Sequence, residues 1–297
     1  MRLIHENVRN FLLISASVRG ASYGRGLPLC FFTLLLIVCG SIRCSHHEPA
    51  YATSSLAPND PEQKTCEMYG VEIVDIMEHD PGAFTQGITF WEGDLFEGTG
   101  RRGQSTLKRR DLDTGEVLTA IRLSDLYFGE GVTVFKGTVY QLTWKSGLCL
   151  TYDAKDLRPL KSFSYEGEGW GLTHDGQYLI MSDGSSQLRF MTPDTFEEKR
   201  RLTVKCQGQA VSGLNELEYV DGMIYANIWC SDSILIIDPD SGRAVGKIDL
   251  GGLLKRGGLE ESKSDVLNGI AFDERGNRLF VTGKCWPALF QVRLIRQ

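Results

Sequence analysis

The sequence has 297 residues, of which 33 are glycine, 9 are proline and 10% are aromatic. This composition supplies many turns between short apolar segments, and it excludes a disordered or a collagen-like chain. The formal net charge of −6 at pH 7 lacks the basic excess that nucleic-acid binding requires. The one basic cluster, at residues 101–110, flanks a predicted turn and is interpreted as a solvent-exposed face, so we expect no nucleic-acid partner.

The N-terminal part of the chain has the pattern of an export signal. Several arginines precede an apolar run at residues 27–39, and small residues follow it. A run of this length fits the apolar region of a signal peptide, whereas a membrane span needs roughly 20 residues. We expect residues 1–44 to be a signal peptide or a signal anchor, residues 45–65 to be a polar linker, and residues 66–297 to be the folded domain. The domain would then be secreted, periplasmic or in the secretory pathway, and an uncleaved anchor would be its only membrane contact.

The predicted domain has an odd number of cysteines, so at least one thiol should stay free even in an oxidising compartment. No two of them have a CxxC or zinc-ribbon spacing, and structural burial is the simplest interpretation for most. They are Cys66, Cys149, Cys206, Cys230 and Cys285.

Five segments of the domain share one pattern: an alternating strand, a turn that contains glycine, and a second alternating strand. The pattern predicts five β-hairpins. The ends of each hairpin are 14 residues apart in the first four and 16 residues apart in the fifth. The segments are residues 86–100, 130–144, 170–184, 215–229 and 268–284, with turn glycines Gly93, Gly137, Gly176, Gly222 and Gly276.

A second repeat, a strand that ends at an Asp or Pro turn and leads to another strand, follows each of the first four hairpins. Four strands per unit and turn glycines 39 to 54 residues apart match the blades of a β-propeller, whose period is roughly 40 to 50 residues. The fifth unit ends after its third strand, at residues 288–294. We predict that residues 71–78 pair with it as the missing outer strand and close an all-β, five-bladed propeller. Only residues 251–264 allow a short helix.

The first strand of each propeller blade lines the central channel, so equivalent hairpin positions form rings. Because the two strands of a hairpin are antiparallel, the ring of first residues and the ring of last residues open at the same mouth. The first ring is Gln86, Glu130, Trp170, Asn215 and Asn268, and the second ring is Gly100, Trp144, Gly184, Trp229 and Lys284.

Glu130 is the only ionisable member of the first ring. In one interpretation, amides and indoles satisfy one another around a water-filled tunnel, as in non-catalytic propellers. In the other, Lys284 and the tryptophans of both rings make a charged mouth with apolar walls, the usual form of a small-ligand site. The repeat alone leaves both interpretations open.

Other motifs add no further site. Residues 98–103 match GxGxxG, but they end a hairpin and no helix follows, so a dinucleotide site is not predicted. His79 and His174 are the only histidines of the domain, too few for a His-based zinc centre. Neither a Ser–His–Asp order nor a GxSxG elbow occurs.

Several stretches around the rings resemble the glutaminyl cyclases of the plant, bacterial and parasite type, over residues 71–293. The stretches are residues 79–87, 127–131, 140–144, 169–171, 215–219, 227–229, 266–270 and 281–286. That family is a five-bladed propeller closed by strand exchange, and it converts N-terminal glutamine to pyroglutamate with release of ammonia. The resemblance therefore implies this fold and activity, peptides or proteins with an N-terminal glutamine as substrates, and we expect a monomer.

Carried over position by position, the resemblance implies catalytic roles for Glu130, Lys284 and Asn215. It implies the substrate-binding residues Phe84, Gln86, Phe128, Trp144, Trp170 and Trp229. Glu130 would move a proton from the attacking amine to the leaving ammonia, Asn215 and Gln86 would bind the substrate amide, and Lys284 would support the oxyanion or orient Glu130. Burial would raise the pKa of Glu130, whereas the charge of Lys284 would lower this pKa. The sequence does not show which of the two effects is larger.

No cofactor is expected for catalysis. The family is associated with a structural metal ion in the channel, for which the sequence indicates no ligands. Two other functions remain open for the same mouth. A binding module would hold a peptide N-terminus or a small amine without turning it over, and a calcium-dependent lactone or ester hydrolase would need a mouth richer in carboxylates.

Overall fold

The computed structural model describes residues 66–260 and 266–297, which belong to the unit Cys44–Gln297. The signal segment expected at residues 1–44 and the linker expected at residues 45–65 lie outside the described residues. Within the described part the chain forms strands and one four-residue helix, α1 (Leu253–Arg256), so the all-β expectation is confirmed. No helix among these residues is long and apolar enough to cross a membrane.

Three sheets have four strands each, paired in chain order. The first holds β2 (Thr85–Trp91), β3 (Asp94–Thr99), β4 (Thr106–Asp111) and β5 (Val117–Arg122). The second holds β6 (Gly129–Phe135), β7 (Thr138–Thr143), β8 (Leu148–Asp153) and β9 (Pro159–Ser164). The third holds β10 (Leu172–His174), β11 (Leu179–Met181), β12 (Gln187–Met191) and β13 (Glu198–Thr203).

A further sheet has eight strands in the order β16-β17-β18-β19-β1-β22-β21-β20. Its strands are β16 (Leu214–Val220), β17 (Met223–Ile228), β18 (Ser233–Ile237), β19 (Ala244–Asp249), β1 (Glu67–Glu78), β22 (Ala288–Arg296), β21 (Arg278–Gly283) and β20 (Leu267–Asp273). A small hairpin of β14 (Lys205–Cys206) and β15 (Gln209–Ala210) forms a sheet of its own, and Lys205 bridges in parallel to Arg243 directly before β19.

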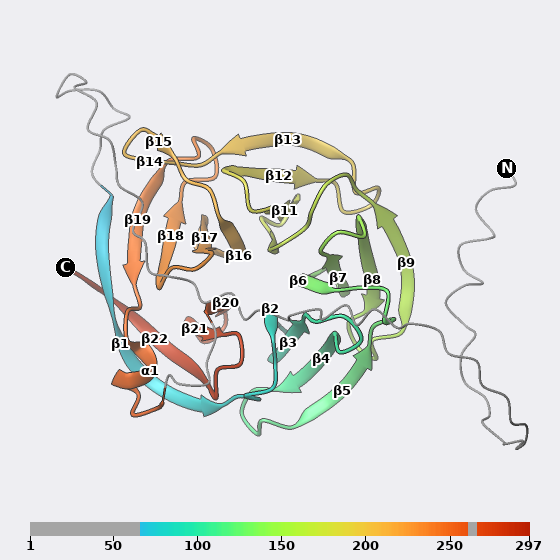
Figure 1. The fold of residues 1–297 in the computed structure, drawn as a ribbon, viewed down its shortest axis with the longest axis horizontal. Coiled ribbons are helices and arrows are strands. Elements are labelled where there is room, and N and C mark those ends of the chain that lie inside the picture. Colours follow the sequence, from blue (N-terminus) through green and yellow to red (C-terminus); the bar gives the residue numbers. More distant parts are fainter. Residues whose placement is uncertain (1–65, 261–265) are drawn as a thin grey trace, which may run out of the picture. The chain divides into compact units, whose positions relative to one another are not determined.

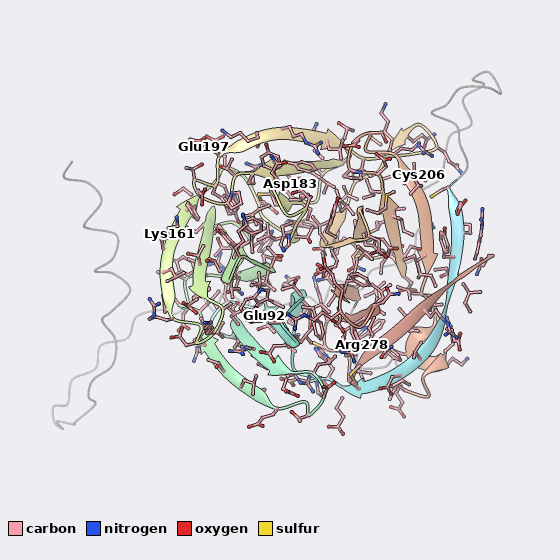
Figure 2. The ribbon with its side chains drawn as sticks, turned by 180° about the vertical axis from the view of Figure 1, so that it is seen from behind. Glu92, Lys161, Asp183, Glu197, Cys206 and Arg278 are labelled. Carbon is pink, nitrogen blue, oxygen red and sulfur yellow. The ribbon has the colours of Figure 1, made fainter. Side chains whose placement is uncertain are left out.

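The sheets are arranged around one centre, with β2, β6, β10, β16 and β20 innermost (Figure 1). Each innermost strand contacts the next one: β2 with β6, β6 with β10, β10 with β16, β16 with β20, and β20 with β2. Every residue of β6 and β20 is buried, whereas the fourth strands β9 and β13 are mostly exposed. Lys161 on β9 and Glu197 directly before β13 accordingly lie at the outer rim (Figure 2).

Apolar side chains pack between neighbouring sheets. Phe96 of β3 and Leu107 of β4, for example, pack against Val132 of β6 and Val139 of β7. Comparable clusters join the other neighbouring units around the centre. Full burial of one such side chain contributes about 1.5–3 kcal/mol, so contacts between sheets supply most of the stabilisation of this arrangement.

The strand β1 joins the two ends of the described chain. It pairs antiparallel with β22 as far as Glu78↔Ala288, a pairing that covers the residues 71–78 singled out by the repeat. Its first residues also pair parallel with β19, beginning at Glu67↔Gly246. The repeat did not predict this second pairing, which makes one eight-stranded sheet of the last two units.

The turn of the fifth hairpin differs from the prediction. The predicted turn glycines of the first four hairpins have φ angles between 77° and 99°, a region that favours glycine. In the fifth hairpin the residue with positive φ is Asn277, at 49°, and not Gly276. This hairpin is two residues longer, so the left-handed position falls one residue later, on a residue type that tolerates it.

A buried ion pair fastens the end of β1. Nε2 of His79 lies 3.0 Å from Oε1 of Glu97, and Nδ1 of His79 lies 2.7 Å from the carbonyl oxygen of Trp286. Both partners are acceptors, so both ring nitrogens must donate and the imidazolium form is required. Burial alone would lower the pKa of His79, but the charge of Glu97 and the hydrogen bonds raise it. Burial opposes ionisation of Glu97 as well, yet His79 holds the pKa of Glu97 below its usual range.

We expect this pair to make the fold less stable at alkaline pH. Because folding raises the pKa of His79, its contribution is fully present below the unfolded pKa of about 6.5 and is lost as the pH rises through the folded pKa. Glu97 contributes above its unfolded pKa of about 4.3, and this contribution is lost as the pH falls through its lowered folded pKa. Urea unfolding above pH 6.5 should show a steeper loss of stability for the native sequence than for His79→Gln. Equal pH slopes would contradict a charged His79.

Candidate active site

Both predicted rings open at one mouth of the innermost strands. The backbone N–H of Gly100 donates to the carbonyl oxygen of Phe84 at 2.8 Å, and that of Trp144 donates to Phe128 at 3.0 Å. Equivalent bonds close the fourth and fifth hairpins, from Trp229 to Gly213 and from Lys284 to Val266, so the last residue of these hairpins lies close to the first. In the third hairpin the N–H of Trp170 donates to the carbonyl oxygen of Ser182 instead. The hairpin turns, with their glycines, lie at the opposite end.

The innermost strands are irregular where the first-ring residues lie. The register of β6 against β7 shifts between Gly129 and Val132, so Glu130 lies in a β-bulge. The pairings of β2, β16 and β20 shift at the corresponding places. In the third unit β10 begins only at Leu172, after Trp170. A bulge changes the direction of a side chain, and here it occurs at each paired position that carries a predicted site residue.

Glu130 is a buried carboxyl group with 4% of its surface exposed. Its Oε1 accepts a hydrogen bond from Nε2 of Gln86 at 3.2 Å. Burial raises the pKa of Glu130 well above its usual range, Lys284 acts against this rise, and the charge of Glu168 adds to it. Burial therefore wins the competition that the sequence left open. A carboxyl group with a raised pKa is suited to accept and return a proton near neutral pH.

Aromatic rings form two groups at this mouth. Phe84 and Phe128 meet edge to face with their ring centroids 6.3 Å apart, and Trp144 lies 5.6 Å from Phe128. Trp170 and Trp229 meet edge to face at 5.8 Å. Trp229 is 47% exposed, so it lies at the rim of the mouth and not deep inside it.

Positive charge gathers beside Phe84. Nζ of the buried Lys284 lies 4.9 Å from the centroid of the Phe84 ring, and the guanidinium of Arg101 lies 4.6 Å from the same ring. Lys284 also acts electrostatically on Glu130. The mouth thus has one cationic side beside an aromatic ring and one buried carboxyl group.

Asn215 and Asn268 complete the first ring. Asn215 is buried, and its carbonyl oxygen accepts a hydrogen bond from Oγ of Ser182 at 2.7 Å. Nδ2 of Asn268 donates to the carbonyl oxygen of Thr85 at 3.1 Å. Oδ1 of Asn268 and Oε1 of Gln86 are buried and have no hydrogen-bond partner among the described residues. Such acceptors are suited to N–H groups of a ligand.

The two glycines of the second ring leave space for side chains of the first. A Cβ atom on Gly100 would overlap the Phe128 ring and lie 3.1 Å from Cγ of Gln86. A Cβ atom on Gly184 would lie 2.7 Å from the indole of Trp170. Any larger residue at either position would therefore displace a predicted binding residue.

Sequence reasoning missed two residues of this mouth: Arg101, which it assigned to a solvent-exposed face, and Glu168. Oε2 of Glu168 accepts hydrogen bonds from Nε1 of Trp144 at 2.6 Å and from Nε1 of Trp170 at 3.0 Å. Its Oε1 lies 3.4 Å from Nζ of Lys145. Glu168 lies in the loop between β9 and β10, outside both repeats, so an alignment of hairpins could not find it.

A buried carboxyl group also lies deeper in the centre. Glu216 follows Asn215 at the position where the other four hairpins have glycine, and its oxygens accept the N–H groups of Ile88 at 3.2 Å and Ile270 at 2.8 Å. Among the described residues, no three His, Cys, Asp or Glu side chains group together to hold a metal ion. Each oxygen of Glu216 therefore accepts one backbone N–H group from another innermost strand.

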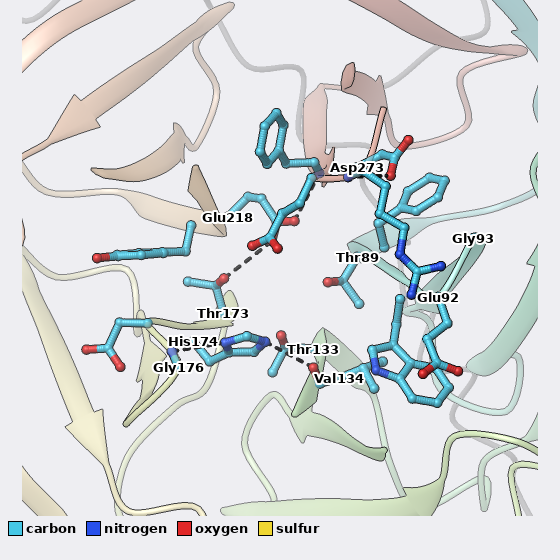
Figure 3. Close-up of a pocket in the computed structure, with 17 residues that line it drawn as sticks. Thr89, Glu92, Gly93, Thr133, Val134, Thr173, His174, Gly176, Glu218 and Asp273 are labelled. Carbon is cyan, nitrogen blue, oxygen red and sulfur yellow. Dashed lines mark hydrogen bonds between the residues drawn. The ribbon is translucent and has the colours of Figure 1, made fainter. Parts of the chain in front are cut away.

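A cavity of about 430 Å³ lies at the opposite end, among the hairpin turns (Figure 3). Glu218 faces it, accepting hydrogen bonds from the N–H of Phe272 at 3.0 Å and from Oγ1 of Thr173 at 3.3 Å. Burial raises the pKa of Glu218 to about 8. None of the nine predicted site residues lines this cavity, so the candidate active site is the mouth that contains Glu130.

Comparison with known proteins identifies the family. The family model of glutamine cyclotransferases matches residues 47–294. The chain belongs to the glutamine cyclotransferase family. A glutaminyl-peptide cyclotransferase of Arabidopsis thaliana is 43% identical over 230 residues, which are 75% of this chain and 71% of that protein. The crystal structure of Myxococcus xanthus glutaminyl cyclase matches with 39% identity and a TM-score of 0.72, covering 78% of this chain and 99% of that chain.

Membership of the glutamine cyclotransferase family gives the activity class. The chain is an enzyme, a glutaminyl-peptide cyclotransferase of the transferase class. The resemblance noted in the sequence is thereby confirmed. The roles of individual residues rest on the geometry of the Glu130 mouth.

Proposed function

We propose that the described residues form a five-bladed β-propeller completed by β1, and that its Glu130 mouth cyclises the N-terminal glutamine of peptides or proteins. The closed succession of innermost strands and the pairing of β1 with β22 support the five blades. The observation that carries the site is the buried carboxyl group of Glu130, hydrogen-bonded to Gln86 beneath aromatic walls. Peptides with an N-terminal glutamine are the substrates that this chemistry requires.

The reaction is an intramolecular aminolysis. The α-amine nitrogen attacks Cδ of the glutamine side chain, and a tetrahedral intermediate with a negatively charged oxygen forms. The bond from Cδ to the side-chain nitrogen then breaks, and ammonia leaves with pyroglutamate as the product. No covalent bond to the enzyme forms. Glu130 accepts the proton that the amine loses and returns it to the departing nitrogen.

Other groups of the mouth have separate tasks in this proposal. The unpartnered Oε1 of Gln86 accepts an N–H of the substrate, and Asn215 binds the substrate amide. The ammonium group of Lys284 stabilises the oxyanion from the cationic side of the mouth. Phe84 and Phe128, with the tryptophans, keep the glutamine side chain folded back on its amine and exclude bulk water.

The raised pKa of Glu130 matches the proton that it must transfer. A carboxylate of ordinary pKa is a weak base near neutral pH. Burial raises the pKa of Glu130 and makes its carboxylate a stronger base toward the amine as it bonds Cδ. Since only the ionised carboxylate accepts a proton, activity should rise with pH through the pKa of Glu130.

Mass spectrometry of a Gln-initiated peptide incubated with the purified full chain tests the proposed function. We expect the peptide to lose the mass of one ammonia, and a matched peptide that begins with Asn to stay unchanged. Binding of the Gln-peptide without any loss of ammonia would instead support the binding module.

We propose that the chain is exported and acts as a monomer, and that catalysis requires no cofactor. Turnover of a Gln-peptide should be unchanged after dialysis against EDTA, because both proton transfers are assigned to Glu130 and charge stabilisation to Lys284. A measured loss of ammonia release that calcium or zinc restores would contradict this assignment and favour a metal-dependent mechanism.

A further inference from the structure

The carboxylate of Glu168 connects the two aromatic groups of the mouth. One oxygen, Oε2, accepts both the Trp144 indole N–H at 2.6 Å and the Trp170 indole N–H at 3.0 Å. Trp144 belongs to the group that contains Phe128, and Trp170 belongs to the group that contains Trp229. The orientation of one wall is thus tied to that of the other through a single oxygen atom.

The loop around Glu168 is itself held in place. The N–H of Gly169 donates to the carbonyl oxygen of Trp144 at 3.1 Å, and the N–H of Trp170 donates to that of Ser182 at 2.9 Å. Nζ of Lys145 lies 3.4 Å from Oε1 of Glu168 and 4.2 Å from the centroid of the Trp144 ring. Partial burial disfavours the charge of Glu168, but the two indoles and Lys145 outweigh it and lower its pKa, so Glu168 is ionised at neutral pH.

We propose that Glu168 is a positioning residue of this active site: its ionised carboxylate fixes the indoles of Trp144 and Trp170 and places a negative charge within electrostatic reach of Glu130. The charge of Glu168 favours the protonated form of Glu130 and opposes the effect of Lys284. Glu168 thereby acts on both the shape of the pocket and the pH at which Glu130 becomes a base. This inference rests on the assignment of Glu130 as the acid–base group.

Two substitutions separate these effects. Glu168→Gln removes the charge and keeps an oxygen that accepts an indole N–H, so the acid limb of the kcat profile should move to lower pH by about half a unit or more. Glu168→Ala removes the acceptor as well, so KM for a Gln-peptide should rise roughly tenfold and the tryptophan emission should shift to longer wavelength. Glu166→Gln is the matched control in the same loop: its side chain is exposed, and both profile and emission should stay unchanged.

An acid limb that does not move in Glu168→Gln would overturn the electrostatic part of the proposal. Unchanged KM and unchanged emission in Glu168→Ala would overturn the positioning part. The emission measurement needs no substrate, so it tests the link between the indoles even if the assignment of Glu130 fails. If Glu168→Ala does not fold, Glu168→Leu, which also removes the acceptor but fills the space of the side chain, gives the KM and emission for the positioning part, and Glu168→Gln still decides the electrostatic part.

A separate observation concerns two cysteines at the start of β1. Cys66 directly precedes Glu67, which pairs parallel with Gly246 of β19. Cys206 of β14 follows Lys205, which bridges in parallel to Arg243, the residue directly before β19. One edge of β19 pairs with β18, so β14 and β1 must both lie along the other edge. Cys206 and Cys66 therefore follow one another along that edge. Figure 2 places Cys206 beside the N-terminal end of β1 (cyan).

We infer that Cys66 and Cys206 form a disulfide when the protein meets a disulfide donor such as oxidised glutathione. The two side chains pack against the same apolar cluster. Both are free thiols in this structure, as are Cys149 and Cys285. Interaction with Cys66 lowers the pKa of Cys206 to about 7, while Cys206 and burial raise the pKa of Cys66, so the Cys206 thiolate is the favoured attacking group.

In this step the Cys206 thiolate attacks the donor disulfide and releases one thiol. The Cys66 thiolate then displaces the second, so two thiols are oxidised and one disulfide is reduced to two thiols. The bond would tie the beginning of β1 to the third and fourth units of the ring. It would constrain the unfolded chain over a long loop, a situation in which a disulfide stabilises strongly.

Non-reducing peptide mapping of the full chain after equilibration with oxidised glutathione tests this inference. We expect a cross-linked pair of the Cys66 and Cys206 peptides, and a Tm that falls by several degrees when a reductant is added. Cys206→Ser should lack the cross-link, and its Tm should fall less than that of the native sequence when a reductant is added. Cys285→Ser should keep the cross-link. Recovery of both cysteines as free thiols, or of Cys66 linked to another cysteine, would overturn it.

Discussion

Glu130→Gln is expected to lower kcat for Gln-initiated peptides by at least about a hundredfold, the usual scale for loss of a general acid–base group. This corresponds to about 2.7 kcal/mol of transition-state stabilisation. An amide can neither accept the proton of the attacking amine nor return it to the leaving nitrogen. The amide oxygen of the replacement can still accept from Nε2 of Gln86, which now donates to Oε1 of Glu130 at 3.2 Å. The pocket should therefore keep its shape, and KM should change little.

Ammonia release measured against peptide concentration gives kcat and KM separately. Glu218→Gln is a suitable control, because Glu218 is also a buried carboxyl group with a raised pKa but lies at the opposite end of the innermost strands. Its kcat should stay close to that of the native sequence. Turnover of Glu130→Gln at the native rate would remove Glu130 from the mechanism.

The internal repeat made most of the site predictable. Because five hairpins have the same length up to one insertion, equivalent positions must face the same mouth, and this predicted Glu130 and Gln86 in one ring, where a hydrogen bond joins them. The same argument placed Trp144 at the mouth that contains Glu130, since the last residue of a hairpin returns to its first. Phe128 precedes the aligned hairpin, and only the resemblance implied it. Periodicity reports position well because the strands of a hairpin are antiparallel and short.

The parts that the repeat could not give are those that depart from it. Glu168 lies in a loop between two units, so its hydrogen bonds to Trp144 and Trp170 depend on how that loop folds back. The pairing of Glu67 with Gly246 joins segments far apart in the chain, with no local pattern to indicate it. The direction of the pKa shift of Glu130 could not be predicted for a different reason. Burial raises this pKa and Lys284 lowers it, and their relative size depends on how deeply Glu130 is buried and how far it lies from Lys284.

Gly171→Ala is expected to be the most destabilising small substitution near the site. A Cβ atom there would overlap the carbonyl oxygen of Asn215 and lie 2.8 Å from Cα of Glu216. Both are backbone atoms of the neighbouring innermost strand, so no side-chain rotation relieves the overlap. Overpacking usually costs about 1–3 kcal/mol, and a fixed backbone neighbour puts this case at about 3 kcal/mol or more.

Urea unfolding of Gly171→Ala and of Gly82→Ala measures the difference directly. Gly82 precedes β2 in an exposed loop, and a Cβ atom there would meet only the side chain of Asp80, at 3.1 Å from Oδ1, which can rotate away. This control should stay within about 0.5 kcal/mol of the native sequence. If Gly171→Ala folds, its kcat should fall too. The strand that must move, β16, carries Asn215, and Gly171 itself directly follows Trp170. If Gly171→Ala is as stable as the native sequence, the innermost strands can spread apart. Contact between these strands would then not fix the spacing of the residues around the Glu130 mouth.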